Sequence, residues 1–225
     1  MLDFEPFYLT LKLVIVTTAI LFIISVPIAY WLVFSRFRFK VLIEALVGLP
    51  LVLPPSVLGF YLLLAFSPNH TFGKFLENYF DLRLVFTFPG LVIASIIYSL
   101  PFMVQPIQSG FKMVPIALRE AAYTLGKGKF TTLMKVLIPN MKASLLTGCI
   151  LSFAHTIGEF GVVLMVGGNI PRETRVISIA IYDEVEAMNY YQANVYSGIL
   201  IAFSFSVLVC VYLVNHRMAK VHYLS

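Results

Sequence analysis

Long apolar stretches alternate with short charged clusters along the whole chain. Four stretches contain no Asp, Glu, Lys or Arg, and a fifth is interrupted only by Glu159; they are Leu13–Ser35, Ala45–Gly73, Leu84–Phe111, Ala187–His216 and Ala143–Pro171. A helix that crosses a bilayer needs about 20 mostly apolar residues. The pattern therefore predicts an all-α membrane protein, a single domain over 1–225, whose five transmembrane helices cover about residues 10–34, 45–66, 85–110, 143–166 and 194–215.

Prolines fall inside the second apolar stretch. Pro50, Pro54 and Pro55 lie in its first third, and each removes a backbone donor and disturbs the helix. Either this helix is kinked or starts late and packs against its neighbours, or it is a broken segment that lines a pathway. Ser56, directly after the proline pair, is placed to cap the helix where it resumes.

The third apolar stretch has the same character. Pro101 and Pro106 predict a second broken helix, and Gln105 and Gln108 are polar positions in its inner half. The glutamines either line a cavity or hydrogen-bond to neighbouring helices, and the two explanations carry equal weight.

The stretch Ala143–Pro171, the fourth in chain order, contains Glu159, the only acidic residue of the apolar segments. A carboxylate inside a membrane is costly and is a functional hypothesis by default. His155 precedes Glu159 by four residues, which predicts that both lie on one helical face and pair there. The pair is either a packing feature near the outer interface or part of a gate, and Gly158 and Gly161 would let another helix approach closely.

The polar segment 112–142 between the third and fourth stretches predicts two short helices. Pro115 suits the first position of a helix, and Gly126 suits the position just past its end. The second short helix is expected to stop at Pro139. Ala121 and Ala122 offer a surface with almost no side chain, which permits another protein to approach the backbone; a helix resting on lipid headgroups is the equal alternative.

Two further segments lie between apolar stretches on the predicted outer side. Residues 67–84 combine polar and aromatic residues, which predicts a short interfacial helix. Residues 167–198 are too charged to cross the bilayer, which predicts a re-entrant or surface helix near Val176–Tyr182. Arg172 and Arg175 either attract an anion or pair with Glu173 and its neighbours.

Composition excludes a soluble domain. The chain of 225 residues is 60% hydrophobic and only 12% charged, with a mean hydropathy of +0.90, whereas soluble domains carry about 25% charged residues. Cys149 and Cys210 both lie in apolar stretches without a Cys partner nearby, so they predict buried thiols and no metal site. The first ten residues lack a basic region and a cleavage site, so no removable signal peptide is expected.

Basic residues predict the orientation in the membrane. Lys and Arg favour cytoplasmic loops, and an outside N-terminus with a cytoplasmic C-terminus puts eleven of the 16 inside: Arg36, Arg38, Lys40, Lys112, Arg119, Lys127, Lys129, Lys135, Lys142, Arg217 and Lys220. The net charge of +5 is therefore an orientation signal, and the scattered basic residues predict no nucleic-acid binding.

The polar segment also resembles a known motif. Glu120-Ala121-Ala122, then Gly126, then Val136-Leu137-Ile138-Pro139 match the EAA loop of ABC importer permeases, in which E-A-A is followed by Gly and by I-x-L-P. Val136 stands for Ile and Ile138 for Leu, and both keep the shape and polarity of the pattern. LPLVLPPSVLG, GEFG and GGNIPRETR further resemble molybdate permeases, with tungstate and sulfate or thiosulfate permeases as close relatives.

This resemblance implies the ABC importer permease (MetI-like) fold and a set of partners. Two copies of the chain would enclose the pathway in the bacterial inner membrane. Two ATPase subunits would bind ATP and Mg²⁺ and dock on the loop. A binding protein outside would deliver molybdate to the Tyr79–Arg83 and Asn169–Arg175 regions. The coupling residues would be Glu120, Ala121, Ala122, Gly126, Val136, Ile138 and Pro139, and the pathway or gate candidates are Pro54, Pro55, Ser56, Gln105, His155 and Glu159.

Other classes of function are weaker. The chain has no G-x-x-x-x-G-K-[ST] loop, so it is not expected to be an ATPase or to hold a cofactor itself. An intramembrane enzyme built on His155 and Glu159 lacks an H-E-x-x-H or G-x-S-x-G motif, and two ligands are too few for a metal cage. A secondary carrier would be expected to show internal repeats.

Overall fold

The first long helix, α1, spans Glu5–Phe34 in the computed structural model, which describes the backbone of residues 3–222 and the side chains as far as Leu213. Pro6 lies in its first turn, where a missing backbone donor costs nothing, and the helix ends just before Arg36 and Arg38. Residues 3–222 are helical with short connections and contain no strand. The all-α fold is therefore confirmed for the described chain.

The second apolar stretch is broken. It forms α2 (Lys40–Gly48), the short 3₁₀ helix η1 (Leu49–Leu51) and α3 (Pro55–Phe66), with a bend of 111° between the two parts. Pro54 precedes α3 in an extended conformation and Pro55 is its first residue. The predicted cap at Ser56 is wrong, because α3 has no side-chain cap and Ser56 lies inside the helix, past the capping position.

The third stretch is one continuous helix, α5 (Phe88–Met113), although Pro101 and Pro106 lie inside it. The prediction that these prolines break the helix is wrong. Within a membrane domain, neighbouring helices can satisfy or shield the backbone groups that a proline frees, and Pro101 is itself buried among such neighbours. Thr87 caps the start of α5 by accepting a hydrogen bond from the N–H of Gly90.

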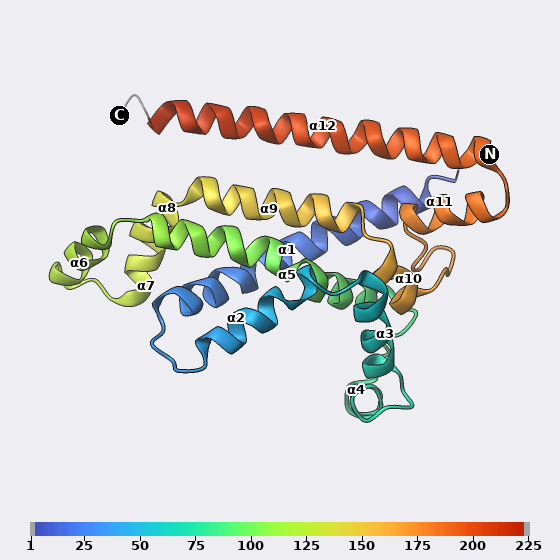
Figure 1. Ribbon diagram of the computed structural model, residues 1–225, viewed down its shortest axis with the longest axis horizontal. Coiled ribbons are helices and arrows are strands. Elements are labelled where there is room, and N and C mark those ends of the chain that lie inside the picture. The colour runs from blue at the N-terminus through green and yellow to red at the C-terminus, as the bar shows by residue number, and fades with distance from the viewer. Residues whose placement is uncertain (1–2, 223–225) are drawn as a thin grey trace.

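The polar segment folds as a helical hairpin at one end of the molecule (Figure 1). Its first arm is α6 (Ile116–Thr124), and its second arm runs without interruption through α7 (Lys129–Thr132), the π-helix η2 (Leu133–Leu137) and α8 (Ile138–Asn140). Pro115 precedes α6 in an extended conformation, so it lies one position before the predicted one.

The fourth stretch is interrupted as well. Helix α9 (Lys142–Ile157) leaves the polar hairpin at an angle of 78°, and a break at residues 158–160 separates it from α10 (Gly161–Gly167). A helix advances about 1.5 Å per residue, so the 16 residues of α9 connect the hairpin to the break over about 24 Å.

Three more helices complete the chain. Helices α4 (Thr71–Phe80) and α11 (Ile177–Glu186) occupy the two segments for which short helices are predicted, and α12 (Tyr190–His222) forms the long C-terminal rod. Figure 1 shows α11 and the N-terminal end of α12 at the end of the long axis opposite α6 and α7. The chain therefore has two distinct ends.

Helices α1, α5 and α9 form the centre of the bundle, and one hydrophobic cluster reaches from them into the polar hairpin. Leu32 of α1 and Phe111 of α5 pack in the same cluster as Leu137 of η2 and Met141. Helices α1, α5 and α12 are long and apolar enough to cross a membrane, and each bent pair of helices can supply one more span.

Candidate functional site

The corner of the polar hairpin is a left-handed turn at Gly126. Its N–H donates to the carbonyl of Tyr123 at 2.9 Å, and the N–H of Lys127 donates to the carbonyl of Ala122 at 3.0 Å. This pair of hydrogen bonds is the Schellman motif, which ends a helix with a residue of positive φ. Gly126 has φ +72°, and a Cβ added there would meet no atom within 4 Å. The backbone conformation, not crowding, therefore requires glycine at this corner.

The two alanines of the motif point in different directions. Ala121 is exposed, whereas Ala122 is only 6% exposed. The expectation that both alanines lie on the accessible surface is therefore wrong for Ala122, because adjacent helix positions lie about 100° apart around the axis. Glu120 is exposed.

A cation–π contact attaches the hairpin to the bundle. The Arg119 guanidinium lies 4.5 Å from the centre of the Phe34 ring, at the last residue of α1. Such contacts contribute roughly 0.5–2 kcal/mol, more when water is excluded. This contact thereby connects α6 to the last residue of α1.

The second arm ends at Asn140, one residue after the predicted stop at Pro139, and Met141 is its C-cap. Pro139 lies inside α8, directly after the π-helix that contains Val136. A π-helix has i→i+5 hydrogen bonds in place of the i→i+4 bonds of an α-helix. This altered spacing is compatible with the missing backbone N–H of Pro139. Met141 and Leu137 are buried, at 3% and 2% exposure, so the bend into α9 is fixed inside the core. Ile138 is half-buried beside them.

The two broken helices touch at their breaks. A Cβ added to Gly161, the first residue of α10, would lie 2.8 Å from the Cβ of Pro55 and 3.5 Å from the backbone N of Ser56. Gly59 lies equally close to Met165, one turn further along both helices. Small residues let helix backbones approach in this way. Gly158, in contrast, has no atom of another helix within 4 Å among the described residues, so it does not bring two helices of this chain together.

Glu159 and His155 do not form the predicted pair, because α9 ends at Ile157 and Glu159 lies in the break. His155 Nδ1 is 2.9 Å from Ser99 Oγ on α5, and its ring stacks on Phe102 at 3.9 Å. Glu159 is 4% exposed, and neither of its carboxylate oxygens has a hydrogen-bond partner among the described residues. Its backbone carbonyl accepts a hydrogen bond from Ser178 Oγ at 2.7 Å, which ties the break to α11.

Gln105 lies at the end of α2, away from the Pro55–Gly161 contact. Its side-chain amide is exposed and reaches over Gly48 of α2, 4.0 Å from where a Cβ of that glycine would be. The structure thus distributes the pathway candidates over three places. Pro55 and the backbone of Ser56 lie against Gly161, next to the break that holds Glu159, and Pro54 directly precedes them. His155 of α9 contacts α5, and Gln105 lies between α2 and α5.

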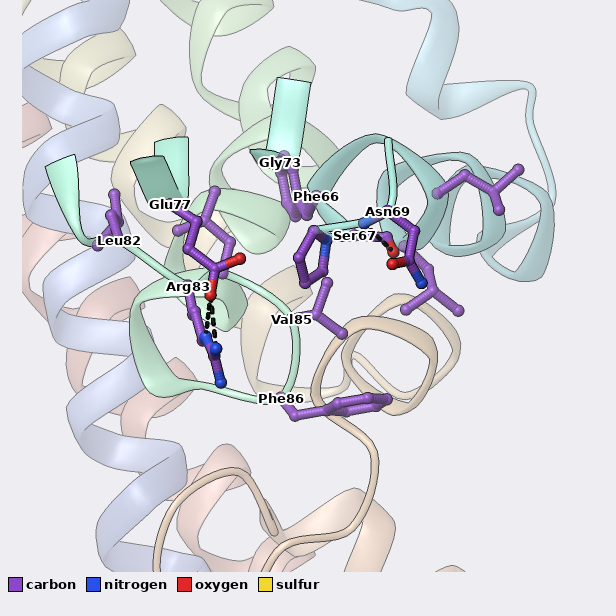
Figure 2. A pocket seen from close by; sticks show the side chains of 13 residues that line it. Phe66, Ser67, Asn69, Gly73, Glu77, Leu82, Arg83, Val85 and Phe86 are labelled. Atoms are coloured by element: carbon purple, nitrogen blue, oxygen red, sulfur yellow. Dashed lines mark hydrogen bonds and ion pairs between the residues drawn. The ribbon is translucent and has the colours of Figure 1, made fainter. Parts of the chain in front are cut away.

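A cavity of about 490 Å³ lies between α3, α4 and the segment that leads to α5 (Figure 2). Arg83 forms an ion pair with Glu77 at its rim, so its charge is neutralised within the chain. Ser67 and Asn69 line another side of the cavity, and Phe86 closes its lower side in the view of Figure 2.

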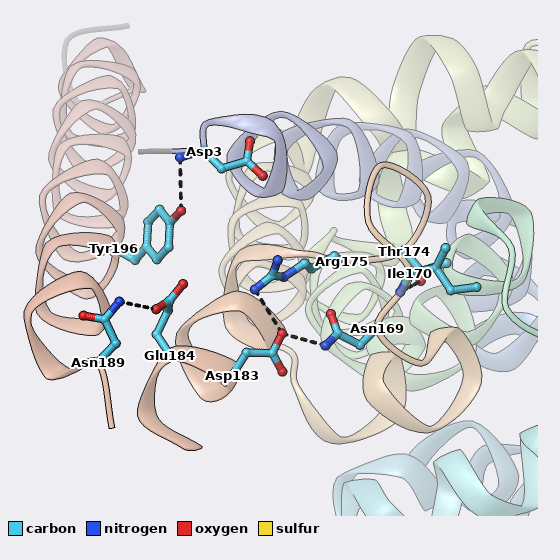
Figure 3. A network of polar contacts seen from close by, with 9 residues as sticks. All are labelled: Asp3, Asn169, Ile170, Thr174, Arg175, Asp183, Glu184, Asn189 and Tyr196. Carbon is cyan, nitrogen blue, oxygen red and sulfur yellow. Dashed lines mark hydrogen bonds and ion pairs between the residues drawn. The ribbon is translucent and has the colours of Figure 1, made fainter. Parts of the chain in front are cut away.

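A polar network holds the segment that connects α10 to α11 (Figure 3). Asp183 of α11 accepts a hydrogen bond from Asn169 at 2.6 Å and pairs with Arg175 at 3.1 Å. Arg172 pairs with Glu5 at 3.2 Å. Both arginines are therefore paired, but with Asp183 and Glu5 and not with Glu173.

The geometry joins a polar helical hairpin, a helix of about 24 Å and two touching helix breaks in one apolar chain. The family model of the binding-protein-dependent transport system inner membrane component matches residues 22–220. The chain belongs to this family. It is accordingly a multi-pass protein of the inner membrane, and its relatives are transport permeases.

Two relatives of the permease are informative. The molybdenum transport system permease protein ModB of Azotobacter vinelandii is 48% identical over 211 residues, which are 93% of each chain. The sulfate transport system permease protein CysT of Salmonella typhimurium is 32% identical over 190 residues, covering 84% of this permease and 68% of CysT. The likeness to ModB thus extends over nearly the full length of both proteins.

Solved structures show the same fold. The structure described as inward-facing conformations of the MetNI methionine ABC transporter matches with a TM-score of 0.71 at 15% identity, covering 95% of this permease and 93% of that chain. The MetI-like fold of ABC importer permeases is thereby confirmed.

Several residues at these sites give little signal in the sequence. Arg119 and Met141 acquire their roles only from the packing of the hairpin, and Glu44, Ser109 and Lys112 surround Gln105 between α2 and α5. The spacing of Gln105, Ser109 and Lys112 is a helical one that could have identified this face. Among the described residues, no group of three or more His, Cys, Asp or Glu is placed to hold a metal ion.

Proposed function

We propose that this permease is the membrane-spanning subunit of an ATP-driven importer that moves molybdate into the cytoplasm. Two copies form the pathway, two ATPase subunits bind and hydrolyse ATP, and an external binding protein delivers the anion. The N-terminus lies outside and the hairpin of α6, α7, η2 and α8 lies inside, as the distribution of Lys and Arg favours. The observation that carries the proposal is the 48% identity to ModB over 93% of both chains.

The hairpin supports a docking role for the predicted coupling residues. It projects at one end of the molecule, and its exposed arm carries Glu120 and Ala121 beside the left-handed corner at Gly126 (Figure 1). A small exposed residue next to a rigid corner lets a partner approach the backbone. Lys127 and Lys129 keep this end of the hairpin polar and exposed.

The packing supports a mechanical route from the hairpin to the pathway. When ATP closes the two ATPase subunits, the hairpins move together, and the buried Leu137 and Met141 transfer this motion to α9. The far end of α9 is the break at Glu159, which packs against the break at Pro55. A tilt of α9 would therefore shift the two breaks against each other and alternate access between the two membrane faces.

The choice of molybdate rests on the relatives. The match between ModB and this permease covers 93% of each chain, whereas the match to CysT leaves about a third of CysT uncovered. Sulfate or thiosulfate is therefore the second candidate substrate, and tungstate, a tetrahedral dianion like molybdate, is the third. The pairing of Arg83, Arg172 and Arg175 with carboxylates of the chain agrees with selection by the binding protein, because these three charges are already neutralised.

The test is anion-dependent ATPase stimulation of the complete transporter in liposomes. The permease, its ATPase and its binding protein are supplied with molybdate, tungstate, sulfate or thiosulfate in turn. Stimulation and uptake with molybdate at lower concentrations than with sulfate are expected. Stimulation by sulfate alone would overturn the molybdate assignment, and a permease that fails to co-purify with an ATPase would overturn the importer itself.

A further inference from the structure

A small polar cavity of about 230 Å³ lies between α2 and the last turns of α5, next to the polar hairpin. Its lining comes almost entirely from side chains that carry hydrogen-bonding groups: Glu44, Val47, Gln105, Gln108, Ser109 and Lys112. Such a concentration of polar groups is unusual for a chain that is 60% hydrophobic.

The cavity opens on one stripe of α5. Gln105, Ser109 and Lys112 are all exposed, and their spacing of four and three residues places them on one face of the helix. Polar and charged side chains that face lipid are costly, so in spans they face water-filled cavities or other protein. This stripe therefore faces water or the partner copy, and not the acyl chains.

The cavity is rich in hydrogen-bond donors. The two glutamines offer amide N–H groups, Ser109 offers a hydroxyl, and Lys112 offers an ammonium group. Among the described residues, no ion pair engages Lys112. An oxyanion only accepts hydrogen bonds, so these groups are of the type that can replace part of its hydration shell.

A carboxylate of the chain already uses one of these donors. Gln108 Nε2 donates to Glu44 Oε1 at 3.1 Å. The Glu44 carboxylate is half-buried, accepts hydrogen bonds as an oxyanion does, and repels a second anion at short distance. It therefore competes with any anion for Gln108 and balances the charge of Lys112.

We propose that this cavity is an inner release site for a tetrahedral oxyanion. Gln105, Ser109 and Lys112 bind the anion as it leaves the pathway, and Glu44 keeps that binding weak so that the anion enters the cytoplasm. This inference rests on the proposed function for the class of ligand and for the side on which the cavity lies. It adds a site and the residue that limits retention there.

Protection of an engineered thiol tests the site directly. Ser109→Cys is made in a chain with Cys149→Ala and Cys210→Ser, and the purified complex with its ATPase, without binding protein, is labelled by neutral N-ethylmaleimide. Sodium molybdate is compared with sodium chloride at equal ionic strength. We expect molybdate to slow labelling at least threefold. Met113→Cys is the matched control, because Met113 is 79% exposed beside Lys112 and does not line the cavity.

Two charge variants give opposite expectations. Lys112→Met should remove most of the protection by molybdate. Glu44→Gln should give the same protection at a severalfold lower molybdate concentration. Each result is the ratio of rates with and without molybdate, so that a direct effect of the charge on thiol reactivity cancels. Gln105→Cys replaces Ser109→Cys if the latter complex fails to assemble.

Several outcomes would overturn the proposal. They are an absence of protection, equal protection at Met113→Cys, and charge variants that do not change the ratio. The engineered thiol could also be labelled slowly without molybdate when the complex is in anionic lipid, and rapidly when it is in detergent. That result would overturn the proposal and assign the cavity to lipid phosphate. Molybdate uptake by the unmodified transporter is measured in parallel. If uptake occurs without protection, the release site fails while the importer stands, and if uptake is absent, the proposed function itself fails.

Discussion

Pro55 lies against Gly161 so closely that a Cβ on the glycine would approach the proline Cβ to 2.8 Å. These two residues begin α3 and α10, the segments that follow the two helix breaks. The contact connects the polar hairpin, through α9, with the proline-rich break. It is the point where motion of one broken helix must displace the other.

Gly161→Ala should disturb this contact. Neither the ring of Pro55 nor the adjacent backbone can move freely, so the added methyl group must separate α3 from α10, and overpacking of this kind costs about 1–3 kcal/mol. We expect a lower thermal midpoint of the purified complex and a severalfold loss of uptake. Gly158→Ala is the control, since the nearest atoms to its added Cβ are 3.9 Å away. Equal behaviour of the two variants would contradict the contact.

Gly126→Val should weaken docking of the ATPase and so lower transport and stimulated ATP hydrolysis together. A left-handed conformation costs roughly 1–2 kcal/mol for a residue with a Cβ, and a β-branched residue fits it worst. The permease should still insert and fold, while uptake and stimulated ATPase activity fall together by an order of magnitude. Gly128→Val is a matched control because Gly128 also has open space but an ordinary φ of −68°. Normal uptake by Gly126→Val would count against the docking role of this corner.

Arg119→Gln should loosen the hairpin from α1. The contact with the Phe34 ring at 4.5 Å is lost, and a double-mutant cycle with Phe34→Leu should give a coupling energy of about 0.5–2 kcal/mol in thermal or denaturant unfolding. Lys127→Gln, which removes an exposed charge at the corner of the same hairpin, should leave stability unchanged. Additive effects of Arg119→Gln and Phe34→Leu would show that the contact contributes nothing.

The sequence predicts where the apolar helical segments lie because the signal is the composition of about 20 residues. A single local contact does not change that composition. It also identifies the corner at Gly126, where the requirement is a property of a single residue. It fails where a proline can be tolerated: Pro101 and Pro106 stay inside α5, which continues past them to Met113. In these places the outcome depends on neighbouring helices and not on the proline itself.

The site was harder to predict for a related reason. His155 and Glu159 have helical spacing, but α9 ends between them, so the pairing rule does not apply. The burial of Ala122 and the hydrogen bond from Gln108 to Glu44 depend on which helices pack together. The local sequence pattern does not indicate that packing. Only the periodic stripe of Gln105, Ser109 and Lys112 is visible without the fold.

The most direct test of the account asks which side of the membrane the hairpin faces. Lys127→Cys is placed in a chain with Cys149→Ala and Cys210→Ser, and a membrane-impermeant thiol reagent is applied to intact cells and to inside-out vesicles. Asn169→Cys, an exposed position at the opposite end of the molecule, is the control for outside labelling. The account predicts that Lys127→Cys is labelled only in inside-out vesicles and is protected there when the ATPase is bound. Labelling of Lys127→Cys in intact cells would contradict it.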